Sequence, residues 1–331
     1  MTRYKIVSLL IFAVLCLQGC ANQSDQQREL AENSAFKIVQ VNAGDSYASL
    51  AQEFLGNASY ASVIERYNPD LLLSASPYIA IPKQVINRSA VFSNGYQLIP
   101  ILCYHQFTKE NKGRTRMEVP ETEFRAQMKY LHDNGYTVVT LADVGLFIRG
   151  NKELPDKSVV ITIDDGYKSY MDIAWPILQE YGFASTMFVY PEFVGAGIAL
   201  KWQDVKKLNR QALIDIQSHS KTHDSLSRRP GGESDDDYLK RLKFEVVDAE
   251  HIISKRIDHV INQFAYPYGN TSPMLIELLQ ANEYDLAVTV ERGSNPAFSA
   301  PFLLNRTMIY GGDSLDTFIR SLDTYAQMDL K

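Results

Sequence analysis

The stretch Ser158-Val-Val-Ile-Thr-Ile-Asp-Asp-Gly-Tyr167 constrains the fold of this chain more than any other. Its first six residues are mostly apolar and β-branched, which is typical of a strand covered on both faces, as in a parallel sheet. Asp164 and Asp165 follow directly, and Gly166 permits a sharp turn after them. Because neighbouring strand residues point to opposite sides, the two carboxylates can serve different tasks. An isolated Asp-Asp-Gly is usually only a turn, so its meaning depends on the other polar residues of the chain.

From Leu98 onwards, apolar strand-like runs alternate with amphipathic helical patterns. This alternation predicts parallel strands joined by crossover helices. In barrels of this kind the active site collects at the C-terminal ends of the strands, where most unusual polar residues of this chain fall. Strands are expected at 98–105, 136–141, 158–163, 184–189, 212–217, 262–265 and 286–290, and helices at 121–134, about 170–178 and 238–253.

A second polar group, His219-Ser-Lys-Thr-His223, follows the expected strand 212–217. If this stretch begins a helix, the two imidazoles lie on one face, which suits two ligands of one metal ion. Two imidazoles with one carboxylate leave room for water at zinc, as in hydrolytic centres, but the same set could bind iron for oxygen chemistry. The second carboxylate favours hydrolysis, because a hydrolase needs a base.

Three stretches resemble successive motifs of the polysaccharide deacetylases, the carbohydrate esterase family 4 or nodulation-type deacetylase fold. They are 161–167, 219–223 and Phe264-Ala-Tyr-Pro-Tyr-Gly269, and the likeness runs over residues 98 to about 312. The resemblance implies an α/β fold, a distorted (β/α) barrel, that removes acetate from N-acetylglucosamine residues of a polymer.

The resemblance also implies roles for individual residues. A divalent metal ion, expected to be zinc, would be held by Asp165, His219 and His223. Asp164 would be the general base. Substrate-binding residues are expected at Tyr167, Tyr266, Tyr268 and Arg306, with Tyr268 lining the sugar groove and its backbone amide helping to bind the oxyanion.

Two departures from the family pattern are visible. The usual Arg of the third motif is replaced by Ala265-Tyr266, so another residue must orient the base, and Arg306 is the candidate. The usual C-terminal His is missing as well, since His259 is the last histidine of the chain.

A different histidine is the candidate for the general acid. The stretch Pro100-Ile-Leu-Cys-Tyr-His-Gln-Phe107 resembles the start of the branch that acts on poly-β-1,6-N-acetylglucosamine, in which an early histidine takes over this role. His105 at the end of the first strand is therefore expected to protonate the departing amine, and that polymer is the favoured substrate.

The N-terminus has the pattern of an export signal. A basic segment at 1–5 precedes an apolar run, 6–17, that is too short to span a bilayer comfortably. Leu17-Gln-Gly-Cys20 resembles the bacterial lipobox, which implies that Cys20 is lipidated and becomes the new N-terminus. A plain signal peptide or an anchor helix is the alternative. Ala21 after the cysteine favours the outer membrane of a Gram-negative cell, facing the periplasm.

Residues 36–83 resemble a LysM module, a β-α-α-β fold that binds glycans containing N-acetylglucosamine, peptidoglycan among them. The residues at 36–41 and 78–82 read as strands, Ser46 can cap a helix through Phe54, and a second helix is expected at about 59–67. A spacer without sugar binding is the alternative.

Together these patterns predict an exported, lipid-anchored, metal-dependent N-deacetylase. Its net charge of −6 argues against a nucleic-acid partner. One alternative is a peptidoglycan or chitin deacetylase, and another is a catalytically inactive glycan-binding lipoprotein. The expected segments are a signal peptide at 1–19, a flexible tether at 20–35, a LysM-like glycan-binding domain at 36–83, a linker at 84–97 and a polysaccharide deacetylase domain at 98–331.

Overall fold

The computed structural model describes residues 28–85, 87–227 and 229–330, so the predicted signal peptide and Cys20 lie outside the described residues. The chain divides into two compact units. The smaller one ends at Asn87 and takes in Val91–Gly95 and the chain from Met328, and the larger one consists of Arg88–Ala90 and Tyr96–Gln327. Within the described ranges, no helix has both the length and the apolar character needed to cross a membrane.

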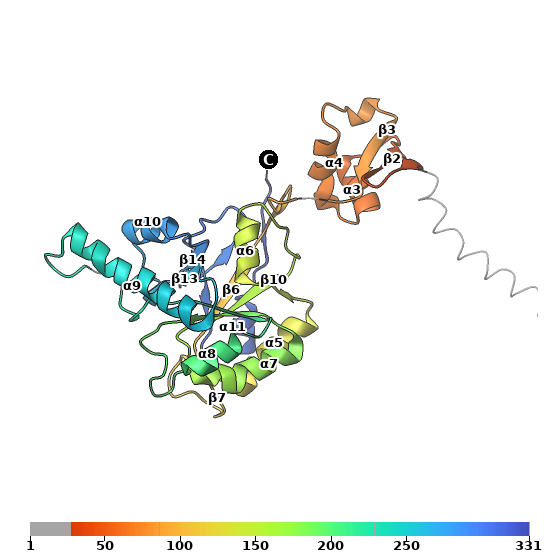
Figure 1. Cartoon of the computed structure of the whole chain (residues 1–331). Coiled ribbons are helices and arrows are strands. Elements are labelled where there is room, and N and C mark those ends of the chain that lie inside the picture. Colours follow the sequence, from red (N-terminus) through yellow and green to blue (C-terminus); the bar gives the residue numbers. More distant parts are fainter. Residues whose placement is uncertain (1–27, 86, 228, 331) are drawn as a thin grey trace, which may run out of the picture. The chain divides into compact units, whose positions relative to one another are not determined.

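The smaller unit is a three-stranded antiparallel sheet, β1-β2-β3, with two helices (Figure 1). Ser46 caps the first helix and forms a capping box with Ser49. Its buried core consists of Val39, Leu50, Ala51, Ile64, Ile79 and Ile81. The elements are β1 (Glu29–Glu32), β2 (Phe36–Gln40), α3 (Tyr47–Leu55), a 3₁₀ turn (Ala58–Tyr60), α4 (Ala61–Tyr67), a second 3₁₀ turn (Leu73–Ala75) and β3 (Tyr78–Pro82).

Strand β1 lies in the segment 20–35, for which the sequence predicts a flexible tether. It pairs with β2, and Arg28 beside it forms ion pairs with Asp45 and Glu53, each at 2.5 Å. The prediction is wrong for residues 29–32, because a largely polar segment can still be held by backbone pairing and by charge.

Short strands also form inside a second segment that the sequence predicts to be irregular, the linker 84–97. Strands β4 (Val91–Phe92) and β5 (Gly95–Gln97) form there, and β5 lies next to β17 (Tyr325–Gln327) in a small sheet. Short strands of two or three residues leave too little alternation in a sequence to be recognised.

The larger unit is built on a nine-stranded sheet. Six strands form its main path in the order β14-β13-β12-β11-β10-β6, and each neighbouring pair is parallel. These strands are β6 (Ile99–Tyr104), β10 (Ser158–Ile163), β11 (Ser185–Val189), β12 (Ile214–Ser218), β13 (Gln263–Ala265) and β14 (Leu286–Val288). The remaining three are β9 (Thr137–Val138) beside β10, and β15 (Ser294–Asn295) and β16 (Thr307–Met308) beside β6.

Helices surround this sheet in Figure 1. A curled sheet of parallel strands with helices around it confirms the predicted distorted (β/α) barrel. The helices are α5 (Glu121–Asp133), α6 (Leu141–Ile148), α7 (Trp175–Tyr181), α8 (Trp202–Leu208), α9 (Asp235–Ile257), α10 (Pro273–Ala281) and α11 (Leu315–Ile319). A π-helical turn, Tyr170–Ala174, leads into α7. Only Thr137–Val138 of the strand expected at 136–141 is formed, because Thr140 caps α6.

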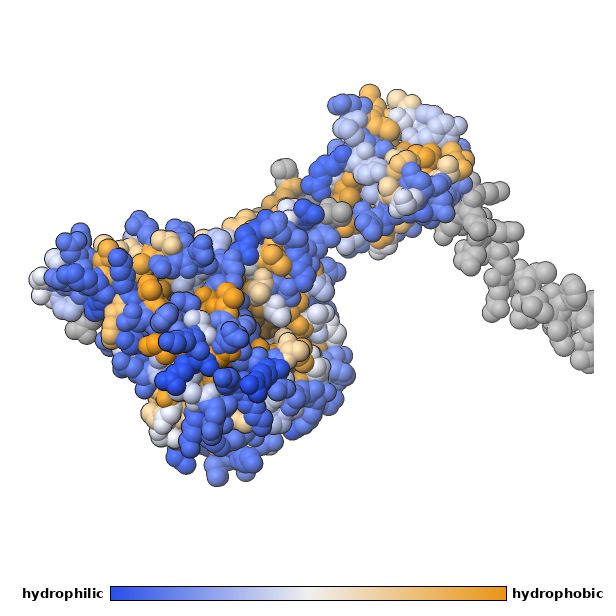
Figure 2. Space-filling view, in the orientation of Figure 1, coloured by the Kyte–Doolittle hydropathy of each residue, from blue (hydrophilic) through white to orange (hydrophobic). Residues whose placement is uncertain are grey.

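Strand β10 shows how the core is arranged. Val159, Ile161 and Ile163 belong to one buried apolar cluster, whereas Val160 belongs to another. Both faces of the strand are therefore covered, and the chain reaches polar residues only where the strand ends. On the visible face of the larger unit, hydrophilic residues cover most of the surface, with smaller apolar areas between them (Figure 2).

Candidate active site

The turn after β10 separates two adjacent carboxylates. Asp165 has a backbone φ of +74°, followed by Gly166 with φ of +82°. Aspartate tolerates this left-handed region better than most residues, whereas a Cβ at position 166 would also lie 3.0 Å from the Val189 side chain. The turn therefore requires glycine after the second carboxylate.

Asp165 faces two histidines. Its Oδ1 atom lies 3.6 Å from Nε2 of His219 and 3.6 Å from Nε2 of His223. This Oδ1 atom is buried and has no hydrogen-bond partner among the described residues. The three ligating atoms lie within 4.8 Å of one another, a set that fits a divalent ion with open positions for water. Metal ligation would satisfy the orphaned oxygen.

The two histidines do not lie on a helix, so that part of the sequence prediction is wrong. Residues 219–223 form a loop in which Ser220 and His223 both have φ of +65°. Glu245 of α9 holds the loop: its carboxylate accepts hydrogen bonds from the backbone N–H groups of Lys221 and Thr222, both at 3.0 Å. The imidazoles converge because of this anchored loop and not because of helical spacing.

The third motif orients His219. Its Nδ1 atom lies 2.8 Å from the carbonyl oxygen of Ala265 at the end of β13. A carbonyl can only accept a hydrogen bond, so Nδ1 carries the proton. Nε2 is therefore unprotonated, and this nitrogen faces Asp165 with a lone pair that can bind a metal ion. Ala265 of the third motif thus contributes a backbone contact to the site.

Burial sets the charges of this group. It lowers the pKa of His219 to about 3 despite the opposing charge of Asp164, so the imidazole is neutral and ready to ligate. Burial, and then the negative charge of Asp164, raise the pKa of Asp165 to about 7. Burial also lowers the pKa of His223. In this environment the Asp165 carboxyl resists ionisation next to two imidazoles whose pKa values are lowered. A bound cation would stabilise the ionised form of that carboxyl.

Asp164 is held by a different partner. Arg306 donates through Nη1 to Oδ1 and through Nη2 to Oδ2, both at 2.7 Å, and through Nε to the carbonyl of Thr289 at 2.7 Å. Burial alone would raise the pKa of Asp164, but Arg306 and then His219 more than offset it, and the pKa lies well below its usual range. The prediction that Arg306 binds substrate is wrong, because its side chain is 0% exposed.

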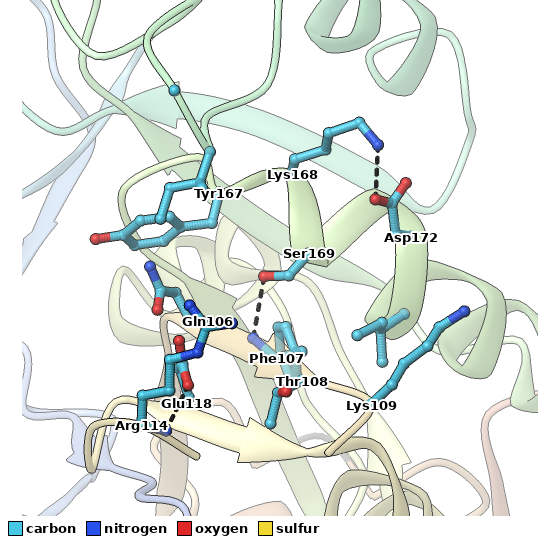
Figure 3. Close-up of a pocket in the computed structure, with 13 residues that line it drawn as sticks. Gln106, Phe107, Thr108, Lys109, Arg114, Glu118, Tyr167, Lys168, Ser169 and Asp172 are labelled. Atoms are coloured by element: carbon cyan, nitrogen blue, oxygen red, sulfur yellow. Dashed lines mark hydrogen bonds and ion pairs between the residues drawn. The ribbon is translucent and has the colours of Figure 1, made fainter.

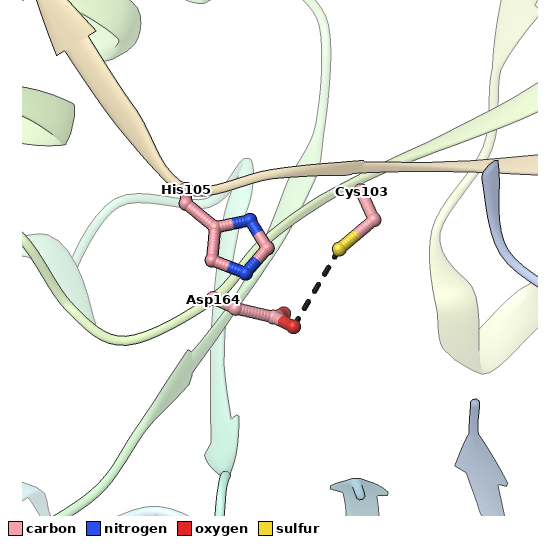
Figure 4. Close-up of side chains that lie close together, drawn as sticks. All are labelled: Cys103, His105 and Asp164. Carbon is pink, nitrogen blue, oxygen red and sulfur yellow. Dashed lines mark hydrogen bonds between the residues drawn. The ribbon is translucent and has the colours of Figure 1, made fainter. Parts of the chain in front are cut away.

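His105 and Cys103 lie close to Asp164 (Figure 4). One ligating atom from each of the three residues lies within 4.8 Å of the others, and the Cys103 thiol donates to Oδ2 of Asp164 at 3.5 Å. Burial raises the pKa of Cys103 well above its ordinary value, so the thiol keeps its proton. Nδ1 of His105 is buried without a hydrogen-bond partner among the described residues.

The predicted substrate-binding tyrosines differ in position. Tyr268, 62% exposed, has its ring 4.8 Å from that of His223, and Tyr167 is half-buried beside Phe193 with ring centroids 5.1 Å apart. Tyr266 is fully buried, and its hydroxyl donates to the carbonyl of Phe302, so the prediction that it binds substrate is wrong. In the third motif only one of the two tyrosines faces solvent.

Two aromatic residues near the site were missed by sequence reasoning. The ring of Tyr190 lies 5.1 Å from that of His223 and stacks on Phe193 at 5.2 Å. Tyr190 directly follows β11, so the rule that functional residues lie at strand ends could have found it. Together with Tyr167 and Tyr268, these rings form an aromatic border around the histidines.

Comparison with known proteins agrees with this geometry. Residues 151–287 match the family model for polysaccharide deacetylase. YxkH of Bacillus subtilis, a protein assigned to the polysaccharide deacetylases, is 28% identical over 220 residues, which cover 66% of this chain and 74% of YxkH.

A second relative is the poly-β-1,6-N-acetyl-D-glucosamine N-deacetylase of Escherichia coli K12, which is 26% identical over 265 residues. The match covers 70% of this chain but 39% of the E. coli protein, so this chain spans well under half of that relative's length. Among solved structures, the Streptococcus pyogenes deacetylase PplD shares the fold with a TM-score of 0.61 at 22% identity, covering 68% of this chain and 98% of PplD.

The matched region 151–287 contains the Asp-Asp turn and the histidine loop described above. Both relatives carry deacetylase names, and the solved structure shares the fold. Residues 151–287 of this chain are thus similar to polysaccharide deacetylases, and homologues that are named deacetylases support an N-deacetylase hydrolase activity.

Proposed function

We propose that this chain is a metal-dependent hydrolase that removes N-acetyl groups from N-acetylglucosamine residues of an extracellular or cell-envelope polysaccharide. The observation that carries the proposal is the orphaned Oδ1 of Asp165, which lies 3.6 Å from each of two imidazole nitrogens. An ionised carboxylate, Asp164, lies beside this group, with its Oδ2 atom 3.8 Å from Nε2 of His219, and is held by two hydrogen bonds from Arg306.

Asp165, His219 and His223 would hold the metal ion, with zinc suited to this ligand set. When bound, such an ion polarises the acetamide carbonyl and lowers the pKa of water. Asp164 remains ionised at neutral pH and accepts a proton from the attacking water through a lone pair that Arg306 leaves free.

An amine departs from the reacting carbon only after it is protonated. His105 lies close to the Asp164 carboxylate and is the group that would donate this proton. Exposed Tyr268 would contact the sugar, because aromatic faces pack against the apolar face of a pyranose ring.

Poly-β-1,6-N-acetylglucosamine is the first candidate substrate. The name of the E. coli relative and the position of His105 at the end of β6 support it. Peptidoglycan or chitin is the second candidate. The order β2-α3-α4-β3 within the smaller unit favours it, because a LysM-like glycan-binding module would have this strand-helix-helix-strand order.

We further propose that Cys20 carries lipid and holds the protein in the cell envelope, at the outer membrane facing the periplasm. The lipobox-like residues 17–20 support this proposal. A Cys20→Ser protein should leave the membrane fraction and change its processed mass, and a variant that stays with membranes and keeps its normal mass would contradict it.

Acetate release tests the catalytic proposal. Purified protein loaded with zinc should release acetate from poly-β-1,6-N-acetylglucosamine faster than from peptidoglycan or chitin oligomers at equal sugar concentration. Exhaustive chelation should abolish release, and added zinc should restore it. Undiminished release after chelation would contradict metal dependence, and faster release from peptidoglycan would favour the second substrate.

A further inference from the structure

A pocket of about 660 Å³ lies beside the candidate active site, a volume in the usual range for small-ligand sites (Figure 3). It is called the side pocket here. Strand β7 (Gln106–Thr108), the connection 109–117 that joins it to β8 (Glu118–Pro120), and the turn into the π-helical segment form most of its wall. Its lining residues are Gln106, Phe107, Thr108, Lys109, Arg114, Glu118, Tyr167, Lys168, Ser169, Asp172, Ile173, Gly197 and Ile198.

The side pocket and the reacting groups share two short pieces of chain. Gln106 directly follows His105, and Tyr167 is the second residue after Asp165. Each step along a chain covers at most ~3.8 Å between Cα atoms. The pocket wall is therefore close enough to Asp165 for a polymer whose reacting sugar lies there to place a neighbouring sugar unit in the pocket.

The lining suits a sugar. Gln106, Thr108 and Ser169 supply amide and hydroxyl groups, while Tyr167 and Ile198 supply apolar surface. A small number of polar groups on a partly apolar wall is the usual composition of a ligand site.

The charges of the pocket are unbalanced. Lys168 is paired with Asp172 at 2.7 Å, and the Glu118 carboxylate accepts a hydrogen bond from the backbone N–H of Arg114 at 2.6 Å. Among the described residues, the side chains of Lys109 and Arg114 form no ion pair with a carboxylate. The wall thus has three cations and two carboxylates, in a chain whose net charge is −6.

This excess is part of a local pattern. The connection 109–117 also contains Lys112 and Arg116, against Glu110 as its only acidic residue. Positive potential therefore concentrates at the side of the pocket that this connection forms.

We propose that the side pocket binds the sugar next to the reacting one and selects against a glucosamine unit at that position. The inference rests on the proposed function, whose product is glucosamine, a sugar with a cationic ammonium group. Repulsion from Lys109 and Arg114 weakens binding of a chain that has already reacted at the neighbouring unit. The enzyme then leaves acetylated units between deacetylated ones.

Trisaccharides of β-1,6-linked N-acetylglucosamine test this inference. One is fully acetylated, and two others contain glucosamine in place of one terminal sugar, at either end. Charge repulsion across a solvated pocket is modest, so kcat/KM for one of the two glucosamine isomers should be about threefold to tenfold lower than for the fully acetylated trimer. The difference should shrink in 1 M salt.

Variants assign the effect to the pocket. The ratio to follow is kcat/KM for the fully acetylated trimer divided by kcat/KM for the disfavoured glucosamine isomer. The double variant Lys109→Gln/Arg114→Gln should bring this ratio to within about twofold of unity. Lys112→Gln, on the same connection but outside the pocket lining, should change the ratio less than the double variant does. Asp172→Asn releases Lys168 from its ion pair and should increase the ratio.

Equal kcat/KM for all three trimers, or a ratio that the double variant does not change, would overturn the inference. In both cases acetate release from the fully acetylated trimer would leave the proposed function standing. Failure to release acetate from any trimer, with zinc bound, would instead overturn the proposed function and the inference that rests on it.

Discussion

Arg306 and Asp164 form a fully buried, two-point ion pair: each carboxylate oxygen accepts one guanidinium N–H at 2.7 Å. The residues are 142 positions apart in the chain. The same guanidinium also donates to the hydroxyl of Thr162 and the carbonyl of Thr289. The carboxylate plane is therefore fixed, and Asp164 stays ionised although it is only 1% exposed.

The first prediction concerns this pair. Arg306→Lys keeps the charge but cannot form two parallel hydrogen bonds, so the carboxylate should lose its fixed orientation. We expect kcat to fall about 10- to 100-fold with little change in KM and with zinc content retained, since misorientation of a reacting group costs rate and not substrate binding. Steady-state kinetics and metal analysis provide the measurement.

Arg292→Lys is the matched control, because Arg292 is exposed in the chain segment before Arg306. It should have wild-type kinetics. Arg306→Ala should lower the free energy of unfolding by about 3–5 kcal/mol, because it leaves a buried carboxylate unpaired. A normal kcat in Arg306→Lys would show that the base needs no fixed orientation.

The second prediction separates the two adjacent carboxylates. Asp164→Asn should keep zinc and lose about two to four orders of magnitude in kcat, because it removes the base. Asp165→Asn should lose zinc, because it removes a ligand. If Asp164→Asn loses the metal and Asp165→Asn keeps it, the two roles are reversed.

Some parts of this site can be predicted from the sequence better than others. Strand β10 and the turn after it could be predicted, because a β-branched run followed by Asp-Asp-Gly is typical of a buried strand that ends in a turn. The histidines His219 and His223 were found by motif, but the helix expected for them is a loop held by Glu245. Loop geometry of this kind depends on a tertiary contact with α9, which local spacing does not contain.

Long-range partners were the hardest to predict. Arg306 was a candidate for orienting the base only because the family's usual Arg is missing, and its burial was not foreseen. Tyr266 and Tyr268 belong to one motif, and sequence alone does not reveal which ring faces solvent. The tether residues 29–32 were misjudged because composition does not record that β2 offers an edge for pairing.

The third prediction concerns His105. Burial lowers the pKa of this imidazole, although the charge of Asp164 partly opposes the shift. A general acid works only while protonated, so activity should fall as pH rises through this lowered pKa. His105→Ala should keep zinc, lose about 10²- to 10⁴-fold in kcat, and lose this alkaline fall. pH–rate profiles check it.

His132→Ala on α5 is the control for that substitution, because His132 is exposed on the helix surface. It should have the wild-type profile. Near-normal turnover in His105→Ala would place the acid elsewhere and would remove the support that His105 gives to poly-β-1,6-N-acetylglucosamine as substrate.

The last prediction concerns the pH dependence of metal binding. With its pKa raised to about 7, Asp165 keeps a proton below that pH in the metal-free protein, and an entering ion must displace it. His219, with its pKa lowered to about 3, is already neutral and contributes no proton. Zinc affinity should therefore fall about tenfold per unit as pH decreases below 7, with about one proton released per ion at pH 6. Calorimetry in two buffers of different ionisation enthalpy measures that number, and a release of two protons would show that a histidine is charged in the free site.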